Sequence, residues 1–174
     1  MVVSFHFAAP GRKTFDVVSE KGVGRIHKRV FRGLIDAEVE ASGSKQKTDS
    51  SISSANYEVR LLGEERLQGR DSYVLELKPK RENKFLLRGK IWVDQQDFAI
   101  AKLEGDPMKS PSFWITRAHV VREYQKVGQF WIPRSDETLC HVRLAGDYIL
   151  RINYGEYTVN GQNLVCADCA LSSK

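Results

Sequence analysis

Short runs of alternating apolar and polar residues follow one another from Tyr57 to Val159. Each run is closed by Gly, Asp, Asn or Pro, which is typical of antiparallel strands joined by turns. The predicted strands cover residues 57–62, 69–79, 89–94, 98–104, 113–127, 130–144 and 148–154. The pattern therefore predicts one long antiparallel meander.

The first third of the chain shows two other patterns. Residues 3–7 and 13–19 alternate around Pro10-Gly11, which predicts a hairpin. Between Arg25 and Ala41 the apolar residues recur every three or four positions, which predicts an amphipathic helix that lays its apolar stripe on the sheet. Residues 42–55 are polar and rich in serine, and they predict a long loop that is either functional or disordered.

Together these patterns predict an α+β fold that is mainly β, a strongly curved antiparallel sheet of about nine or ten strands. We expect a single domain over residues 1–160 and a C-terminal tail over 161–174. Gly155 shifts the apolar parity of the last strand and predicts a β-bulge there. Pro133 is expected at an edge or a bulge, because proline cannot donate to a central ladder.

Composition and charge limit the classes of function. The chain has 174 residues and a net charge of +5, and its basic residues are interleaved with acidic ones, which is typical of a solvated sheet face. The aromatic residues are spread over many strands without an alternating basic pattern, so nucleic-acid binding is not expected. No apolar stretch is long enough for a membrane span, and no secretory signal is seen. Because Met1 leads directly into an apparent strand, we expect an incomplete gene product.

The residues that could carry chemistry are isolated along the sequence. No nucleophile motif or phosphate-binding glycine loop is present, and the four histidines have no clear partners, so an enzyme is not expected. Cys166 and Cys169 form a CxxC without further ligands for zinc, so no metal or other cofactor is predicted. A disulfide between them stays open, as do incidental roles for them and for Cys140.

The order of short motifs resembles that of a known family. The motifs are Tyr57-x-Val-x-Leu-Leu, Gly69-Arg-x-x-Tyr-Val-Leu-x-Leu-x-Pro79, Lys90-Ile-Trp-Val-Asp94 and Gly128-x-x-Trp-x-Pro133. They resemble the outer-membrane lipoprotein-sorting proteins, the LolA/LolB/RseB-like superfamily. The resemblance implies an incomplete β-barrel whose open side is covered by a helix. It also implies a periplasmic, non-catalytic protein that binds lipid or lipoprotein acyl chains in an apolar cavity.

The predicted cavity lining combines the inward parity of the strands with the helix stripe. These residues are Phe5, Phe7, Phe15, Val17, Ile26, Val30, Leu34, Ile35, Val59, Leu61, Tyr73, Leu75 and Leu77. An acyl chain would take the place of the helix contacts. We therefore expect a monomeric lipid-binding protein, and the resemblance implies a role as carrier in lipoprotein sorting. The alternative is an envelope signalling or scaffold module that binds a protein partner and no cavity ligand.

Overall fold

The computed structural model describes residues 2–8, 12–19, 51–110, 113–155, 157–159 and 162–164, and its regular elements there are all strands. The chain divides into two compact units, Met1–Asn56 and Tyr57–Lys174. The strands are β1 Val2–Ala8, β2 Arg12–Ser19, β3 Tyr57–Leu67, β4 Arg70–Pro79, β5 Leu87–Asp94, β6 Ile100–Pro107, β7 Ile115–Val127, β8 Phe130–Val142, β9 Gly146–Asn153, β10 Tyr157–Val159 and β11 Gln162–Leu164. The predicted boundary at residue 160 stays a prediction.

The first unit contains the N-terminal hairpin. β1 and β2 pair antiparallel, with Phe5 opposite Phe15, so the predicted hairpin is confirmed. The predicted helix, residues 25–41, lies outside the described residues, as does most of the predicted loop. The helical part of the expected fold therefore stays a prediction.

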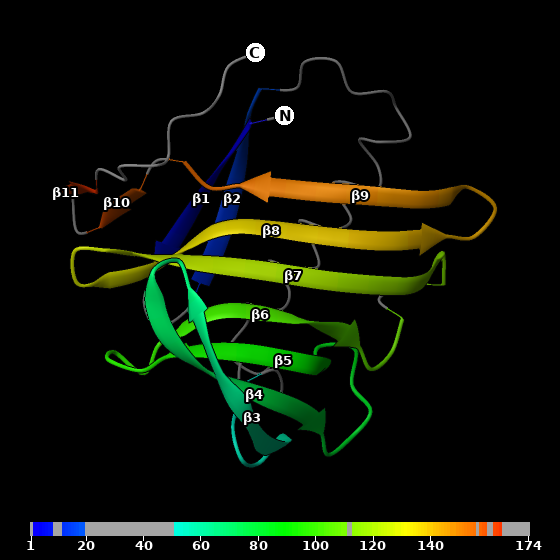
Figure 1. Cartoon of the computed structure of the whole chain (residues 1–174). Helices are drawn as coiled ribbons and strands as arrows, with labels where there is room; N and C mark the ends of the chain where they lie inside the picture. Colours follow the sequence, from blue (N-terminus) through cyan, green and yellow to red (C-terminus); the bar gives the residue numbers. More distant parts are fainter. Residues whose placement is uncertain are drawn as a thin grey trace. The chain divides into compact units, whose positions relative to one another are not determined.

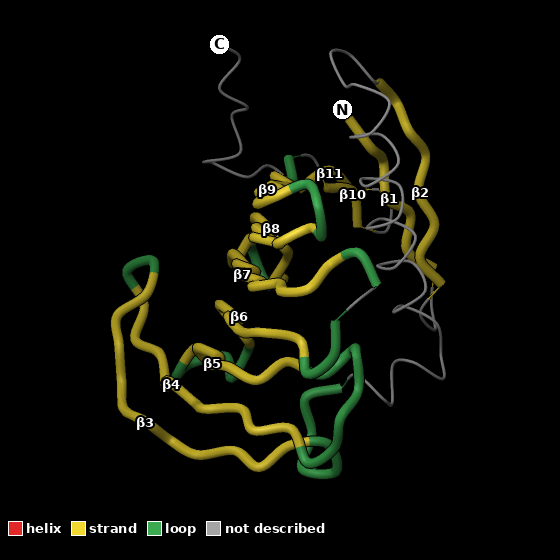
Figure 2. The backbone as a smooth tube through the Cα atoms, turned by 90° about the vertical axis from the view of Figure 1, so that its right-hand side faces the viewer, coloured by secondary structure: helices red, strands yellow, loops and turns green. Residues whose placement is uncertain are grey.

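Strands β3 to β9 form one seven-stranded antiparallel sheet in the second unit, in simple sequence order (Figure 1). The predicted meander is thus confirmed. The expectation of a strongly curved sheet is not: the sheet is open, neither closed nor strongly curled, and its strands follow one another in a single layer (Figure 2). The physical reason is that closure requires the first and last strands to pair, whereas β3 and β9 each pair with one neighbour only.

Cross-strand register separates the side chains of this sheet into two faces. Residues opposite each other in an antiparallel ladder share a face, and successive residues alternate. One row across the strands is charged and runs Arg60, Glu76, Lys90, Glu104, Val121, Glu137, Arg151. The adjacent row, one residue further along β3, has its side chains on the opposite face and begins with Leu61, Leu75, Ile91 and Leu103. The charged row and the apolar row therefore lie on opposite faces, which we call the polar face and the apolar face, although the polar face also carries the buried pair Val74 and Trp92.

Charges of opposite sign alternate along the polar row. Arg60 lies 3.0 Å from Glu76, and Arg151 forms an ion pair with Glu137 at the other side of the sheet. Such cross-strand pairs contribute little individually because they are solvated. Their position confirms that the interleaved charges of the sequence belong to a solvated sheet face.

Two glycines face each other where β5 and β6 come very close. Gly89 lies opposite Gly105 in the ladder. A Cβ atom added at Gly89 would lie 1.9 Å from the carbonyl oxygen of Glu104, well inside van der Waals contact. Only glycine fits at this approach, which the sequence pattern alone did not indicate.

One end of the sheet is joined by a polar cluster, which we call the Arg70 cluster: Arg70, Asp94, Asp97, Lys126 and Trp131. Arg70 donates from Nε and Nη2 to both carboxylate oxygens of Asp94, at 2.6 and 2.8 Å. Asp97 accepts from Nη2 of Arg70 at 3.2 Å and from the indole N–H of Trp131 at 2.9 Å. Its carboxylate also lies 2.6 Å from Nζ of Lys126. The cluster therefore connects β4, the β5–β6 turn and the β7–β8 hairpin.

Asp94 is the buried centre of this cluster. It also accepts hydrogen bonds from the backbone N–H groups of Gln96 and Asp97, which shapes the β5–β6 turn. The bonds from Arg70, helped by these backbone groups, hold the pKa of Asp94 at about 2, below its ordinary value. Gly69, the other half of the Gly-Arg motif, has φ of 78° in the β3–β4 turn. Several residues that carry the family resemblance thus meet in space and serve the architecture.

Two finer sequence predictions had different outcomes. Pro133 lies beside a register shift between β7 and β8, so its expected place at a bulge is confirmed. The bulge expected at Gly155 is wrong. The seven-stranded sheet ends at Asn153, and residues 157–159 pair instead with β11 in a separate two-stranded sheet. A change of sheet explains the shift in apolar parity.

Candidate ligand-binding face and end groove

The apolar face of the seven-stranded sheet is the first candidate site. Three adjacent rows of paired residues build it, and they supply large aliphatic or aromatic side chains from β3 to β7 and from β9, whereas β8 contributes Thr138 and Asp136. Its main members are Val59, Leu61, Tyr73, Leu75, Leu77, Ile91, Val93, Leu103, Val120, Leu150 and Ile152. Strand alternation places them together because the sequence repeats apolar residues at every second position.

Five of the predicted cavity residues lie together on this face. Val59 is opposite Leu77 and Leu61 is opposite Leu75, with Tyr73 on the same side of β4. Burial falls steeply toward the edge strand: Leu77 is 1% exposed, whereas Val59 and Leu61 are 48% and 58% exposed. The apolar face therefore has a buried centre and an open margin along β3.

The remaining predicted residues are placed differently. Phe5, Phe7, Phe15 and Val17 belong to β1 and β2 in the first unit. The four helix residues, Ile26, Val30, Leu34 and Ile35, lie outside the described part of the chain. Their role as cavity lining stays a prediction.

A polar pair interrupts the apolar face, and sequence reasoning missed it. Arg122 donates from Nε and Nη2 to Asp136 at 2.6 and 3.0 Å, and the Tyr154 hydroxyl donates to the same carboxylate at 2.9 Å. Asp136 is buried, so these charge-assisted bonds compensate for its desolvation. Because Arg122 lies on β7, Asp136 on β8 and Tyr154 just after β9, only the register could have revealed this contact.

The second candidate is a groove of about 650 Å³ at the end of the sheet opposite the Arg70 cluster. It is bounded by the last residues of β6 and β8 and the first residues of β7 and β9. None of the five predicted cavity residues that lie on this sheet, Val59, Leu61, Tyr73, Leu75 and Leu77, lines it. Two histidine–carboxylate pairs do: Nδ1 of His119 is 2.7 Å from Asp106, and Nδ1 of His141 is 2.6 Å from Asp147. Sequence reasoning treated these histidines as isolated.

The groove holds no activated nucleophile among its described residues. Cys140 is one of its lining residues, but the side chain is 5% exposed and faces away from the paired histidines. Burial, followed by the charge of Asp147, raises the pKa of the Cys140 thiol, so the thiol form dominates. The Ser110 hydroxyl donates to the backbone carbonyl of Thr116. The arrangement can bind polar groups, but it does not assemble a nucleophile with its base.

Metal and membrane sites can be assessed over the described part of the chain. No group of three or more His, Cys, Asp or Glu residues there is arranged to hold a metal ion. No helix described by the structure is long and apolar enough to cross a membrane.

Comparison with known proteins gives one match. A protein-family model described as "Uncharacterized protein" matches residues 43–140, which is more than half of the chain. No curated protein and no solved structure matches the chain. The resemblance to the lipoprotein-sorting proteins therefore stays a prediction.

Proposed function

The chain belongs to this uncharacterized family, and we propose that it is a non-catalytic protein that binds an acyl chain or a similar lipid on its apolar face. The observation that carries the proposal is the open margin of that face. Val59 and Leu61 are half exposed on β3, directly beside the buried centre formed by Leu77 and Ile91. An apolar ligand lying along this margin would extend an existing apolar surface.

The apolar term can support binding of moderate strength. Each buried methylene contributes about 0.8 kcal/mol, so an acyl chain of about a dozen carbons gains roughly 10 kcal/mol when it is fully buried. Association costs about 4–15 kcal/mol in lost freedom, so net binding requires a cost in the lower half of this range, and the expected affinity is moderate and reversible. This suits a protein that takes up a ligand and gives it up again.

A place in the periplasm and a role as carrier in lipoprotein sorting rest on the family resemblance. The motifs behind that resemblance lie largely in the Arg70 cluster and in core strands. They support a shared architecture more directly than a shared ligand.

The exposed edge strand favours a second candidate, an envelope scaffold that binds a protein partner. β3 is eleven residues long and lies at one edge of the sheet, with its side chains mostly exposed. Such an edge offers unpaired backbone groups to an added strand. In this case the partner, not a lipid, would cover Val59, Leu61 and Leu62.

Organic extraction of the purified protein followed by mass spectrometry tests for a bound lipid, and displacement of a fluorescent fatty acid measures affinity. Leu61→Asp should weaken fatty-acid binding by about tenfold or more, because a charge would enter the apolar margin. The matched control is Ile149→Asp, since Ile149 is equally exposed but lies on the polar face of β9. Leu75→Asp provides a second variant nearer the centre, and circular dichroism checks that each variant is folded.

The outcomes separate the two candidates. Lipid in the extract and a selective loss with Leu61→Asp would support the ligand-binding function. A clean extract together with no fatty-acid binding would refute it and leave the scaffold. Equal effects of Leu61→Asp and Ile149→Asp would also refute the proposed site.

A further inference from the structure

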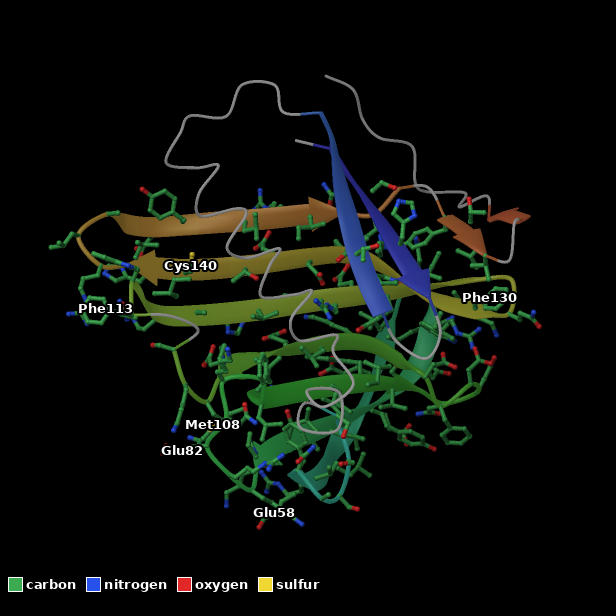
Figure 3. The ribbon with its side chains drawn as sticks, turned by 180° about the vertical axis from the view of Figure 1, so that it is seen from behind. Glu58, Glu82, Met108, Phe113, Phe130 and Cys140 are labelled. Carbon is green, nitrogen blue, oxygen red and sulfur yellow. The ribbon has the colours of Figure 1, made fainter. Side chains whose placement is uncertain are left out.

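The groove end of the sheet carries three large apolar side chains that project into solvent. Phe113 and Trp114, just before β7, are 70% and 56% exposed, and Leu144 in the β8–β9 turn is 96% exposed. We call these three residues the apolar tip. Figure 3 shows Phe113 at this end of the sheet and Phe130 at the other. Exposing such side chains together is costly in water, so the tip needs an explanation.

Specific contacts hold the tip together. The rings of Phe113 and Trp114 pack edge to face with centroids 5.4 Å apart. The backbone N–H of Arg143 donates to the carbonyl of Trp114 at 2.8 Å, so the β8–β9 turn is tied to the segment before β7. Leu144 has φ of 66° in this turn, a conformation that is unusual for leucine. The two segments therefore present their apolar side chains as one unit.

Basic side chains accompany the tip. The guanidinium of Arg143 lies 4.6 Å from the centre of the Phe113 ring. Arg117 is also exposed, and neither arginine forms an ion pair within the described residues. The acidic groups nearby are engaged: Asp106 and Asp147 each contact a histidine, and Glu82 lies 3.5 Å from Lys109.

We propose that the apolar tip docks on the surface of an anionic lipid bilayer. Trp prefers the boundary between headgroups and acyl chains, where its apolar ring is buried and its indole N–H stays hydrated. Phe113 would add an apolar anchor beside it. Leu144 at the apex of its turn can enter the acyl region without moving the sheet. Arg117 and Arg143 would then lie at the level of the phosphate groups, where arginine binds phosphate well.

The opposite end of the sheet provides a built-in comparison. Phe98 is 73% exposed there, but it lies beside the Arg70 cluster, in which Arg70 and Lys126 are ion-paired with Asp94 and Asp97. The charges of this cluster balance, so it offers no unpaired cation to an anionic surface. The proposal therefore predicts that one exposed phenylalanine binds the bilayer and the other does not.

Co-sedimentation with lipid vesicles tests the proposal. The wild-type chain should bind vesicles that contain about a third phosphatidylglycerol, bind pure phosphatidylcholine weakly, and detach as salt rises. Phe113→Ala combined with Leu144→Ser should lower partitioning about tenfold, whereas Phe98→Ala should leave it unchanged. Leu144→Ser alone, at an almost fully exposed position, keeps the test valid if the double variant does not fold.

Binding also has a spectroscopic signature. Trp114 should shift its emission to the blue on binding vesicles, and Trp114→Phe should abolish that shift. Absence of wild-type binding, or an equal loss with Phe98→Ala, would overturn the proposal, as would a tip that mediates self-association without vesicle binding. The proposal does not rest on the proposed function, because fatty-acid displacement by the same tip variants should stay unchanged.

Discussion

Replacing Asp94 with asparagine should destabilise the seven-stranded sheet by about 2–3 kcal/mol. The substitution keeps the shape of the side chain, and its oxygen can still accept from the turn backbone. It removes the charge that receives two bonds from Arg70, at 2.6 and 2.8 Å. Loss of one partner of a fully buried ion pair costs about 3–5 kcal/mol, and the value here is lower because Arg70 is partly exposed to solvent.

Urea denaturation followed by circular dichroism measures this change. The midpoint should fall while the slope of the free energy against urea stays constant. Glu58→Gln is the matched control, since it removes the same charge from an ion pair with Lys78 at 3.6 Å whose side chains are mostly exposed. That variant should change stability by at most about 0.5 kcal/mol. Equal effects of the two substitutions would refute the buried role assigned to Asp94.

The same pair of proteins gives a pH test with a definite sign. The pKa of Asp94 is lowered from 3.8 to about 2 in the folded chain, chiefly by the hydrogen bonds from Arg70. A lowered carboxyl pKa contributes stability above the unfolded value, and that contribution is lost as pH falls from about 4 toward 2. At about 1.4 kcal/mol per pKa unit the contribution is roughly 2 kcal/mol, and screening around Arg70 reduces it to about 1–2. The difference between wild type and Asp94→Asn should therefore be constant near neutral pH and shrink below pH about 4.

Two further predictions concern close packing and a buried thiol. Gly89→Ala should destabilise the sheet by about 3 kcal/mol or more, because the added Cβ would overlap the carbonyl oxygen of Glu104. Gly63→Ala in β3 is the control and should change stability by at most about 0.5 kcal/mol, because a Cβ there has no neighbour within 4 Å. Urea titrations of the two variants decide this, and equal midpoints would contradict it. Cys140 should react slowly with a thiol reagent at pH 8, in a variant with both tail cysteines changed to serine, because burial and then the nearby Asp147 raise its pKa. Reaction as fast as that of the urea-unfolded chain would contradict the burial of Cys140.

Local sequence signals predicted the strands well. Alternation identified the strands of the meander and placed Val59, Leu61, Tyr73, Leu75 and Leu77 on one face, as the register shows. Short-range alternation is sufficient here because a strand records its two faces directly in the sequence. The open edges of the sheet were not predictable in this way, since closure depends on whether distant strands pair.

Side-chain contacts between paired strands were also beyond the sequence. The pairing of His119 with Asp106 and of Arg122 with Asp136 depends on register, which no short window contains. The Gly-Arg motif was recognised as a family feature, but its bond to Asp94 became visible only in three dimensions. The apolar tip was missed for a similar reason: sequence indicates that an aromatic residue is apolar, but not that its surroundings leave it uncovered.

The simple strand order of the sheet has a consequence for how the chain assembles. Each of strands β3 to β9 pairs only with its neighbours in sequence, so successive hairpins can form while later strands are still being synthesised. Two contacts are exceptions. In the Arg70 cluster, Trp131 bonds to Asp97 across 34 positions of the chain, and Gln68, in the turn just before Arg70, donates to the carbonyl of Tyr124 across 56. These ties can close only after β7 and β8 have left the ribosome. We expect the sheet to form early, one hairpin at a time, and the end that carries the Arg70 cluster to become rigid last.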